Sequence, residues 1–320
     1  MLLLSKEGKF NSERFDQFLA RLAATPVEHA VDQYGFLGHL ISMGSRAEDI
    51  YVLMLHGERL VASFDASGQD NSECLAVAGF ISSLKDWADF HVAWTGRLQE
   101  DNLTHFHMTD FAYSWGEFKE GWKDNEERRR SLLADLIGII RSHCFHSFGC
   151  VVENKHFDKL SESNKEEFRL CAFSLAARTC VGRVSEYLRD NGLSHVRVGY
   201  VFEDGDKGKG HLIDLMVRDR YRAPFFASKK ERIDPQGQIV ESYPPLQAAD
   251  ILAYELALLF LDASKPHRDQ RYPNPSRWRW AMKELYKAPP LKWGYYQASD
   301  LNQLNEKLDS LIEEANPIQL

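Results

Sequence analysis

The sequence predicts an α/β protein in which one mixed β-sheet is covered by helices. Three observations support this prediction. From residue 57 onward, short apolar stretches bounded by turn residues alternate with amphipathic helical segments. The stretch 195–202 is largely apolar beyond Arg197, which is typical of a central strand buried on both faces. The segment 246–261 is a nearly all-apolar helix and must therefore be buried on most sides.

The composition is that of a globular protein with one large domain or two modest ones. The chain has 320 residues, of which 44% are hydrophobic and 27% charged. It contains no run of about 18 apolar residues and its start lacks the features of a signal peptide, so we expect no membrane partner. Its five cysteines are odd in number and lack CxxC spacing, which argues against a disulfide framework or a cysteine zinc cluster. Reduced thiols indicate a cytoplasmic location.

The first part of the chain is expected to contain a helical extension, a β-hairpin and an inserted helical region, in that order. Residues 1–56 are expected to form a helical N-terminal extension, and 57–264 the α/β domain. Within the domain, strands 60–65 and 74–81 form a hairpin after the turn residues Ser67-Gly68. An inserted helical region follows near 82–143. Its expected parts are a helix at 86–98, a short strand or loop at 105–111 and an amphipathic helix at 126–143.

The second part of the domain alternates strands and helices. A strand at 146–153 leads into a long helix that ends at the stop signal Asn191-Gly192. Residues 265–320 are expected to be an Arg/Trp-rich helical tail that packs on the domain. The remaining expected elements are a helix at 165–190, a strand at 195–202, a helix at 208–220, an edge strand within 225–233, the apolar helix 246–261 and a final helix at 301–315.

Three acidic residues stand where chemistry is expected. Asp65 and Glu203 each end an apolar strand, and Asp250 lies inside the apolar helix. A carboxylate in such a helix costs several kcal/mol unless it is paired, protonated or bound to metal. Strand ends and a helix packed across them can bring three carboxylates together, and such ligands suit Mg²⁺ or Mn²⁺. We therefore predict a metal site at Asp65, Glu203 and Asp250, with Asp204 as a further candidate ligand.

Each acid also has a purely structural interpretation. In this interpretation Asp65 only caps the turn at 67–68. Glu203 and Asp204 would then belong to a solvated loop after a strand, and Asp250 would pair with a buried arginine. The placement of all three together favours the metal site over these separate alternatives.

Four motifs resemble a known family. They are Phe64-Asp-Ala-Ser-Gly, the helix with Trp87 and Trp94, Phe106-His-Met, and Pro245-Leu-Gln-Ala-Ala-Asp-Ile-Leu-Ala-Tyr. Together they resemble the family known as domain of unknown function 3800, which is similar to ribonuclease H-like nucleases and integrases. The resemblance covers residues 60–262, and the Leu-Gln-x-x-Asp motif is its most specific part. Ala66 stands where the family commonly has a glutamate.

The resemblance implies a ribonuclease H-like fold with four acidic positions. These are an aspartate on the first strand, an acid on a helix, an acid ending the fourth strand and an acid on the last helix. Asp65, Glu203 and Asp250 match the first, third and fourth. The second position is left open among Glu153, Glu166 and Glu167.

The resemblance also points to His107, which is similar to the family's histidine after the second strand. In a metal nuclease it would orient water or contact phosphate. The alternative is a histidine packed beside Trp and Phe side chains.

The charge distribution predicts a nucleic-acid partner. The chain has 39 basic and 47 acidic residues, a net charge of −8, but 207–293 holds 16 basic and 10 acidic residues. A net +6 in an otherwise acidic protein indicates an anion-binding surface, unless these charges are scattered in space. We expect the segment 218–232 to border the acidic cluster. The predicted phosphate-binding residues are Arg218, Arg220, Arg222, Lys229 and Lys230.

These observations favour one function and leave one alternative. The favoured function is a metal-dependent nuclease or phosphodiester-processing enzyme of ribonuclease H-like type, acting on DNA or RNA. The alternative is a catalytically degenerate module of the same fold that binds nucleic acid or a protein partner. No P-loop, GxGxxG after a strand, or GxSxG motif is present, so nucleotide-dependent chemistry and serine hydrolysis rank lower.

Overall fold

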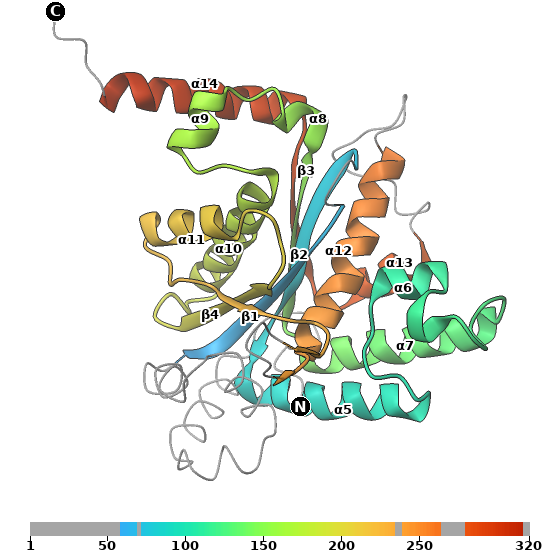
Figure 1. Cartoon of the computed structure of the whole chain (residues 1–320). Helices are drawn as coiled ribbons and strands as arrows, with labels where there is room; N and C mark the ends of the chain where they lie inside the picture. The colour runs from blue at the N-terminus through green and yellow to red at the C-terminus, as the bar shows by residue number, and fades with distance from the viewer. Residues whose placement is uncertain (1–57, 69–71, 234–238, 264–278, 316–320) are drawn as a thin grey trace, which may run out of the picture.

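The computed structural model describes residues 58–68, 72–233, 239–263 and 279–315 (Figure 1). The predicted N-terminal helical extension, 1–56, lies outside the described residues. A six-stranded mixed sheet forms the centre of the described fold, so the prediction of an α/β protein with a helix-flanked mixed sheet is confirmed.

The sheet has the strand order β5-β4-β1-β2-β3-β8. The first three strands in the chain form an antiparallel meander, and β4 then pairs parallel to β1. The outer strands β5 and β8 are parallel to β4 and β3. The strands predicted at 60–65, 74–81, 146–153 and 195–202 therefore share one sheet. The strands are β1 (Glu58–Ser67), β2 (Cys74–Ser83), β3 (His146–Glu153), β4 (Arg197–Glu203), β5 (Phe225–Ala227) and β8 (Leu291–Tyr296).

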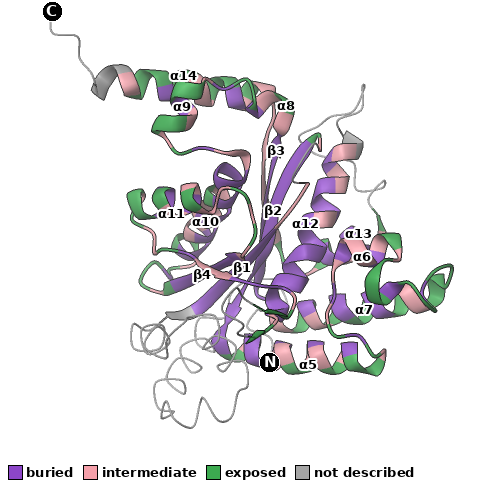
Figure 2. Ribbon diagram, in the orientation of Figure 1, coloured by how far each residue is buried: buried purple, intermediate pink, exposed green. Residues whose placement is uncertain are grey.

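Helices cover both faces of the sheet, and each face has its own apolar core (Figure 2). Side chains alternate along β1, so that Val61 packs on one face and Ala62 and Phe64 pack on the other. The first face carries α5 (Leu84–Glu100), α6 (Met108–Tyr113), α7 (Glu126–His143), α12 (Pro244–Ala263) and α13 (Trp280–Lys287). The second face carries α10 (Ala172–Asp190), α11 (Lys209–Arg218) and α14 (Ala298–Ala315).

The apolar helix α12 packs across β1 and β2, as predicted. It begins with Pro244 and Pro245, which suit the first turn of a helix because the backbone N–H groups there need no helical partner. It is long and apolar enough to cross a membrane, but 78% of the 18-residue window at 244–261 is buried inside the protein. The helix is accordingly a core element of this fold.

Three local expectations were wrong. The expected helix at 165–190 is two helices, α9 (Glu162–Glu167) and α10, separated by Phe168–Cys171. The region around 105–111 contributes the short helix α6. The tail is not purely helical, because β8 adds an edge strand beside β3. Every residue of β8 is only partly buried, so its sequence lacks the apolar pattern of the central strands.

Smaller elements complete the description. The expected edge strand within 225–233 is the short β5, followed by a separate two-stranded ribbon. The turn after β1 requires glycine, since Gly68 has φ +84° and an added Cβ would lie 2.2 Å from the carbonyl oxygen of Cys74. The remaining elements are α8 (Asn154–Phe157), the 3₁₀ turn η1 (Gly116–Phe118), β6 (Arg232–Ile233) and β7 (Ile239–Val240).

Candidate functional site

Three carboxylates converge on one lysine ammonium. Lys229 Nζ lies 2.7 Å from Asp65 Oδ2, 2.8 Å from Glu203 Oε2 and 3.3 Å from Asp250 Oδ1. The acids come from the end of β1, the end of β4 and the middle of α12. The three residues singled out from the sequence therefore meet at one point. We call Asp65, Glu203, Asp250 and Lys229 the carboxylate–lysine cluster.

The cluster is almost fully removed from solvent. The side chain of Asp65 is 0% exposed, those of Asp250 and Lys229 are 5% and 9% exposed, and that of Glu203 is 20% exposed. Asp65 Oδ1 accepts a hydrogen bond from the backbone N–H of Ala66 at 2.8 Å. Both oxygens of Asp65 therefore have partners, and Glu203 provides the side of the cluster nearest to solvent.

The pKa values of the two aspartates in the cluster are shifted in opposite directions. Burial raises the pKa of Asp65 well above its usual range. Lys229 lowers this pKa, but the nearby Glu203 and Asp250 carboxylates raise it further. Burial alone would also raise the pKa of Asp250, but Lys229, His107 and the backbone N–H of Met108 outweigh it and hold that pKa below its ordinary value. Burial opposes the charge on Lys229, yet the three carboxylates raise its pKa well above normal. Lys229 is thus a permanent cation at neutral pH.

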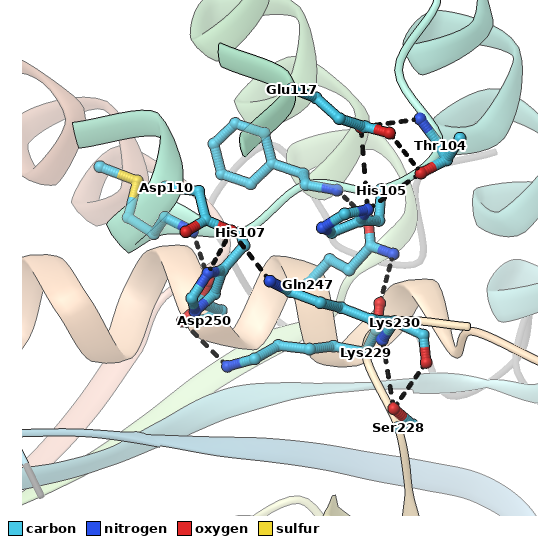
Figure 3. Close-up of polar contacts among 12 residues, drawn as sticks. Thr104, His105, His107, Asp110, Glu117, Ser228, Lys229, Lys230, Gln247 and Asp250 are labelled. Atoms are coloured by element: carbon cyan, nitrogen blue, oxygen red, sulfur yellow. Dashed lines mark hydrogen bonds and ion pairs between the residues drawn. The ribbon is translucent and has the colours of Figure 1, made fainter. Parts of the chain in front are cut away.

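The strand pairing places Lys229 in the cluster. Because β5 runs parallel to β4 with Ala227 beside Glu203, the two residues that follow β5 pass over the end of β4. The carbonyl of Ser228 accepts a hydrogen bond from Tyr243 N at 2.7 Å. The carbonyl of Lys229 accepts one from Gln247 Nε2 at 2.8 Å (Figure 3). The backbone of Lys229 is therefore held between the sheet and the start of α12.

Gln247 joins three segments at this point. Its Oε1 accepts hydrogen bonds from Trp94 Nε1 and from the backbone N–H of Phe106, both at 2.8 Å, while its Nε2 holds Lys229. It is 1% exposed. The Leu-Gln-x-x-Asp motif was singled out from the sequence, but no role was predicted for the glutamine itself. Its spacing of three residues from Asp250 puts both side chains on one face of α12, which was the signal available.

Asp250 ties the helical insertion to the cluster. Its Oδ2 accepts a hydrogen bond from Met108 N at 2.6 Å, at the first turn of α6. The adjacent His107 places Nδ1 2.8 Å from Asp110 Oδ2, and Lys230 Nζ contacts the same oxygen at 2.8 Å (Figure 3). His107 therefore lies against the Asp110 carboxylate beside the cluster, and its side chain is partly exposed.

The donor set suits a hard divalent cation, but the lysine occupies the point where such an ion would sit. Three carboxylates from three segments are ligands that Mg²⁺ and Mn²⁺ prefer. Across the described part of the chain, no three His, Cys, Asp or Glu side chains are arranged to hold a metal ion as they stand. An ion at Asp65, Glu203 and Asp250 requires the Lys229 ammonium to withdraw, because two cations cannot share this position.

The other predicted site residues lie elsewhere. Asp204 follows Glu203 in the chain, but its carboxylate pairs with Lys209 at 2.7 Å and with Arg232, so the structure assigns it to a separate ion-pair group. These two cations lower the pKa of Asp204 although partial burial opposes them. The prediction of Asp204 as a metal ligand finds no support in this arrangement.

The predicted basic segment divides into two parts. The part containing Lys229 and Lys230 borders the carboxylates, as expected. Arg218 does not, since α11 runs for ten residues, about 15 Å, from the neighbourhood of Asp204 and ends with Arg218 above the Phe168 ring. Arg220 and Arg222 lie in the connection between α11 and β5. Lys229 itself is buried among carboxylates in this conformation. Its contact with a phosphate backbone stays a prediction, and it requires the side chain to move.

Within the described residues, none of the three candidates for the second acid joins the cluster. The longest of the helices between β3 and β4, α10, has no acidic residue in its first turn. Of the three candidates, Glu166 and Glu167 are exposed. Glu153 pairs with His156 at 3.2 Å and accepts a hydrogen bond from Tyr295. The cluster is thus built from three acids and one lysine.

Comparison of the chain with protein-family models, with curated proteins and with solved structures finds no match. The resemblance to the domain of unknown function 3800 family stays a prediction.

Proposed function

We propose that this protein is a divalent-metal-dependent nuclease or phosphodiester-processing enzyme of ribonuclease H-like type that acts on nucleic acid. The observation that carries the proposal is the convergence of Asp65, Glu203 and Asp250 from two strand ends and one buried helix. This placement agrees with three of the four acidic positions that the family resemblance implies. The cytoplasmic location predicted from the cysteines belongs to the same proposal.

In this proposal Asp65, Glu203 and Asp250 hold Mg²⁺ or Mn²⁺. The bound ion would activate water and stabilise the leaving oxygen of a phosphodiester. The chain's own residues have distinct tasks. Asp250 stays ionised at neutral pH because Lys229, His107 and Met108 N stabilise its charge. Lys230, which is 39% exposed beside Asp110, is placed to meet a phosphate at the rim.

Lys229 has two positions in this scheme. Without a metal ion it neutralises the buried carboxylates, which would otherwise repel one another. A bound ion would take the place of the ammonium, and the flexible stem of Lys229 would let the ammonium reach a substrate phosphate. Metal binding and the observed position of Lys229 therefore exclude each other, and removal of the ammonium should strengthen metal binding.

A cleavage assay tests the proposed activity. Purified protein is incubated with single-stranded DNA, duplex DNA, RNA and DNA–RNA hybrid, with Mg²⁺, Mn²⁺ or EDTA. We expect divalent-dependent cleavage that Asp250→Asn abolishes. The matched control is Glu255→Gln, which alters another buried carboxylate of α12 outside the cluster and should leave cleavage unchanged. Cleavage in EDTA, or equal cleavage by Asp250→Asn, would contradict the proposal.

One observation favours the alternative of a catalytically degenerate binding module. Lys229 already contacts all three carboxylates and so supplies the positive charge that a metal ion would bring. Calorimetric titration of Mg²⁺ and Mn²⁺ into wild type, Asp250→Asn and Lys229→Met distinguishes the two functions. A nuclease binds metal tenfold or more tightly after Lys229→Met and loses it after Asp250→Asn. A binding module shows no metal binding in any of the three proteins.

A further inference from the structure

Two exposed aromatic rings stand together on the helical insertion. The rings of Tyr113 and Trp115 are stacked, with centroids 5.0 Å apart and planes at 24°. Tyr113 is 61% exposed and Trp115 is 56% exposed. More than half of the surface of each residue is therefore accessible to a ligand. We call these two residues the aromatic pair.

The backbone holds the aromatic pair in place. Ser114, which stands between Tyr113 and Trp115 in the sequence, has the left-handed backbone conformation at φ 56°, which a serine adopts rarely. Trp115 N donates to the carbonyl of Asp110 at 2.8 Å, which closes the end of α6. From α7, Arg129 donates to Ser114 Oγ at 3.2 Å and to the carbonyl of Phe111 at 2.7 Å. The exposed rings are thus presented by a turn that hydrogen bonds define at several points.

The aromatic pair is one short helix away from the carboxylate–lysine cluster. The first residue of α6, Met108, donates its N–H to Asp250, and the last residue of α6 is Tyr113. Six helical residues span about 9 Å, which matches two to three stacked nucleotides at about 3.4 Å each. Lys230 Nζ contacts Asp110 of the same helix at 2.8 Å, and Asp110 stands between Met108 and Tyr113 in the sequence.

Resting on the proposed function, we propose that the aromatic pair binds unpaired bases of a single-stranded nucleic acid whose backbone passes Lys230 toward the cluster. Open aromatic faces bind bases by stacking, and this requires bases that are not already enclosed in a duplex. Stacking tolerates any base, so the pair selects for strandedness and not for sequence. Stacking of bases on aromatic rings requires no metal ion, so we expect this binding to persist in EDTA.

Fluorescence anisotropy with labelled oligonucleotides in EDTA tests this proposal apart from cleavage. We expect single-stranded oligonucleotides to bind wild type more tightly than the matching duplex. Tyr113→Ala/Trp115→Ala should weaken single-strand binding about tenfold or more and leave duplex binding unchanged. The conservative control Tyr113→Phe/Trp115→Phe keeps two stacking rings and should retain binding within about threefold. Thermal melting checks that all variants fold. We expect them to fold because both substituted residues are exposed.

The outcomes separate this proposal from the proposed function. Equal single-strand affinity in wild type and the double-alanine variant, or no single-strand binding by wild type, overturns the aromatic pair as a base-binding site, whatever the cleavage assay shows. Loss of single-strand binding in the double-alanine variant supports it, even if wild type cleaves nothing. A preference for duplex over single strand in both wild type and the double-alanine variant would also overturn the proposal.

Discussion

Asp250 and Glu255 are both buried carboxylates of helix α12, but their surroundings differ. Asp250 is contacted by the Lys229 ammonium and by Met108 N. Glu255 has a side chain that is 0% exposed, and its partner is Arg279 at 3.3 Å, a residue that is itself 53% exposed. Neither Glu255 oxygen forms a well-directed hydrogen bond within the described structure.

The pKa values of the two acids are therefore shifted in opposite directions. The pKa of Asp250 is held below its ordinary value, because its charged partners outweigh the effect of burial. Burial raises the pKa of Glu255 to about 7, since Arg279 compensates only partly. The comparison teaches that burial marks a carboxylate as unusual, while its neighbours decide whether it stays ionised. An acid suited to hold a cation needs the neighbours that Asp250 has.

The largest expected effect comes from removing the cation at each acid. Lys229→Met leaves three buried carboxylates without their counter-ion and should lower the free energy of unfolding by about 3–5 kcal/mol at pH 7 without divalent ions. Arg279→Met should lower it by under about 1 kcal/mol, because half of that side chain is exposed to solvent. Urea unfolding of both variants provides the measurement. Similar losses in the two variants would show that the two acids depend equally on their cations.

The next largest effect concerns pH. Between the ordinary glutamate pKa of 4.5 and about 7, folded Glu255 keeps its proton while the unfolded chain releases it. Rising pH therefore favours unfolding over this range, and Glu255→Gln removes the effect. We expect the variant to gain about 2–3 kcal/mol over wild type between pH 5 and pH 8. The check is urea unfolding of both proteins at these two pH values, and a constant difference would refute the assignment.

A smaller effect is expected at the residue that positions Lys229. Gln247→Leu leaves the indole N–H of Trp94 and the N–H of Phe106 without their acceptor, which should cost about 1–3 kcal/mol of stability. Because the Lys229 carbonyl is also released, the variant should lose metal affinity or cleavage beyond its loss of stability. Measurement well below the melting temperature separates the two effects. Wild-type activity in a destabilised Gln247→Leu protein would limit this glutamine to a structural role.

The smallest expected effect on stability is at Lys230. Its side chain is 39% exposed and its ammonium pairs with Asp110, so Lys230→Ala should change the free energy of unfolding by under about 1 kcal/mol. If it contacts phosphate, the log–log salt slope of nucleic-acid binding should fall by about 0.7–0.9. Anisotropy at several salt concentrations measures the slope. Arg218→Ala, at the far end of α11, is the matched control and should leave the slope unchanged.

Much of the sheet and the three acids could be predicted because they depend on local pattern. Central strands are mostly apolar, and an aspartate in an apolar helix stands out from its neighbours. The edge strand β8 could not be predicted in the same way. Its apolar residues Leu291, Trp293 and Tyr295 pack against the core but are only partly buried, and they alternate with Lys292, Gly294 and Tyr296. Residues of an edge strand are less buried than those of a central strand, so their sequences are less distinctly apolar.

The sequence by itself determined the core of this protein: which stretches are apolar enough to form central strands and which helix must be buried, because burial of apolar surface depends on residue type and period alone. Only the tertiary structure decided what the charged residues do. Lys229 stands in a polar run that reads as solvent-exposed, yet it meets Asp65, 164 positions away in the chain, inside the protein. Its burial depends on β5 pairing beside β4 and on α12 crossing the sheet, and the charge of a residue carries no information about those distant partners.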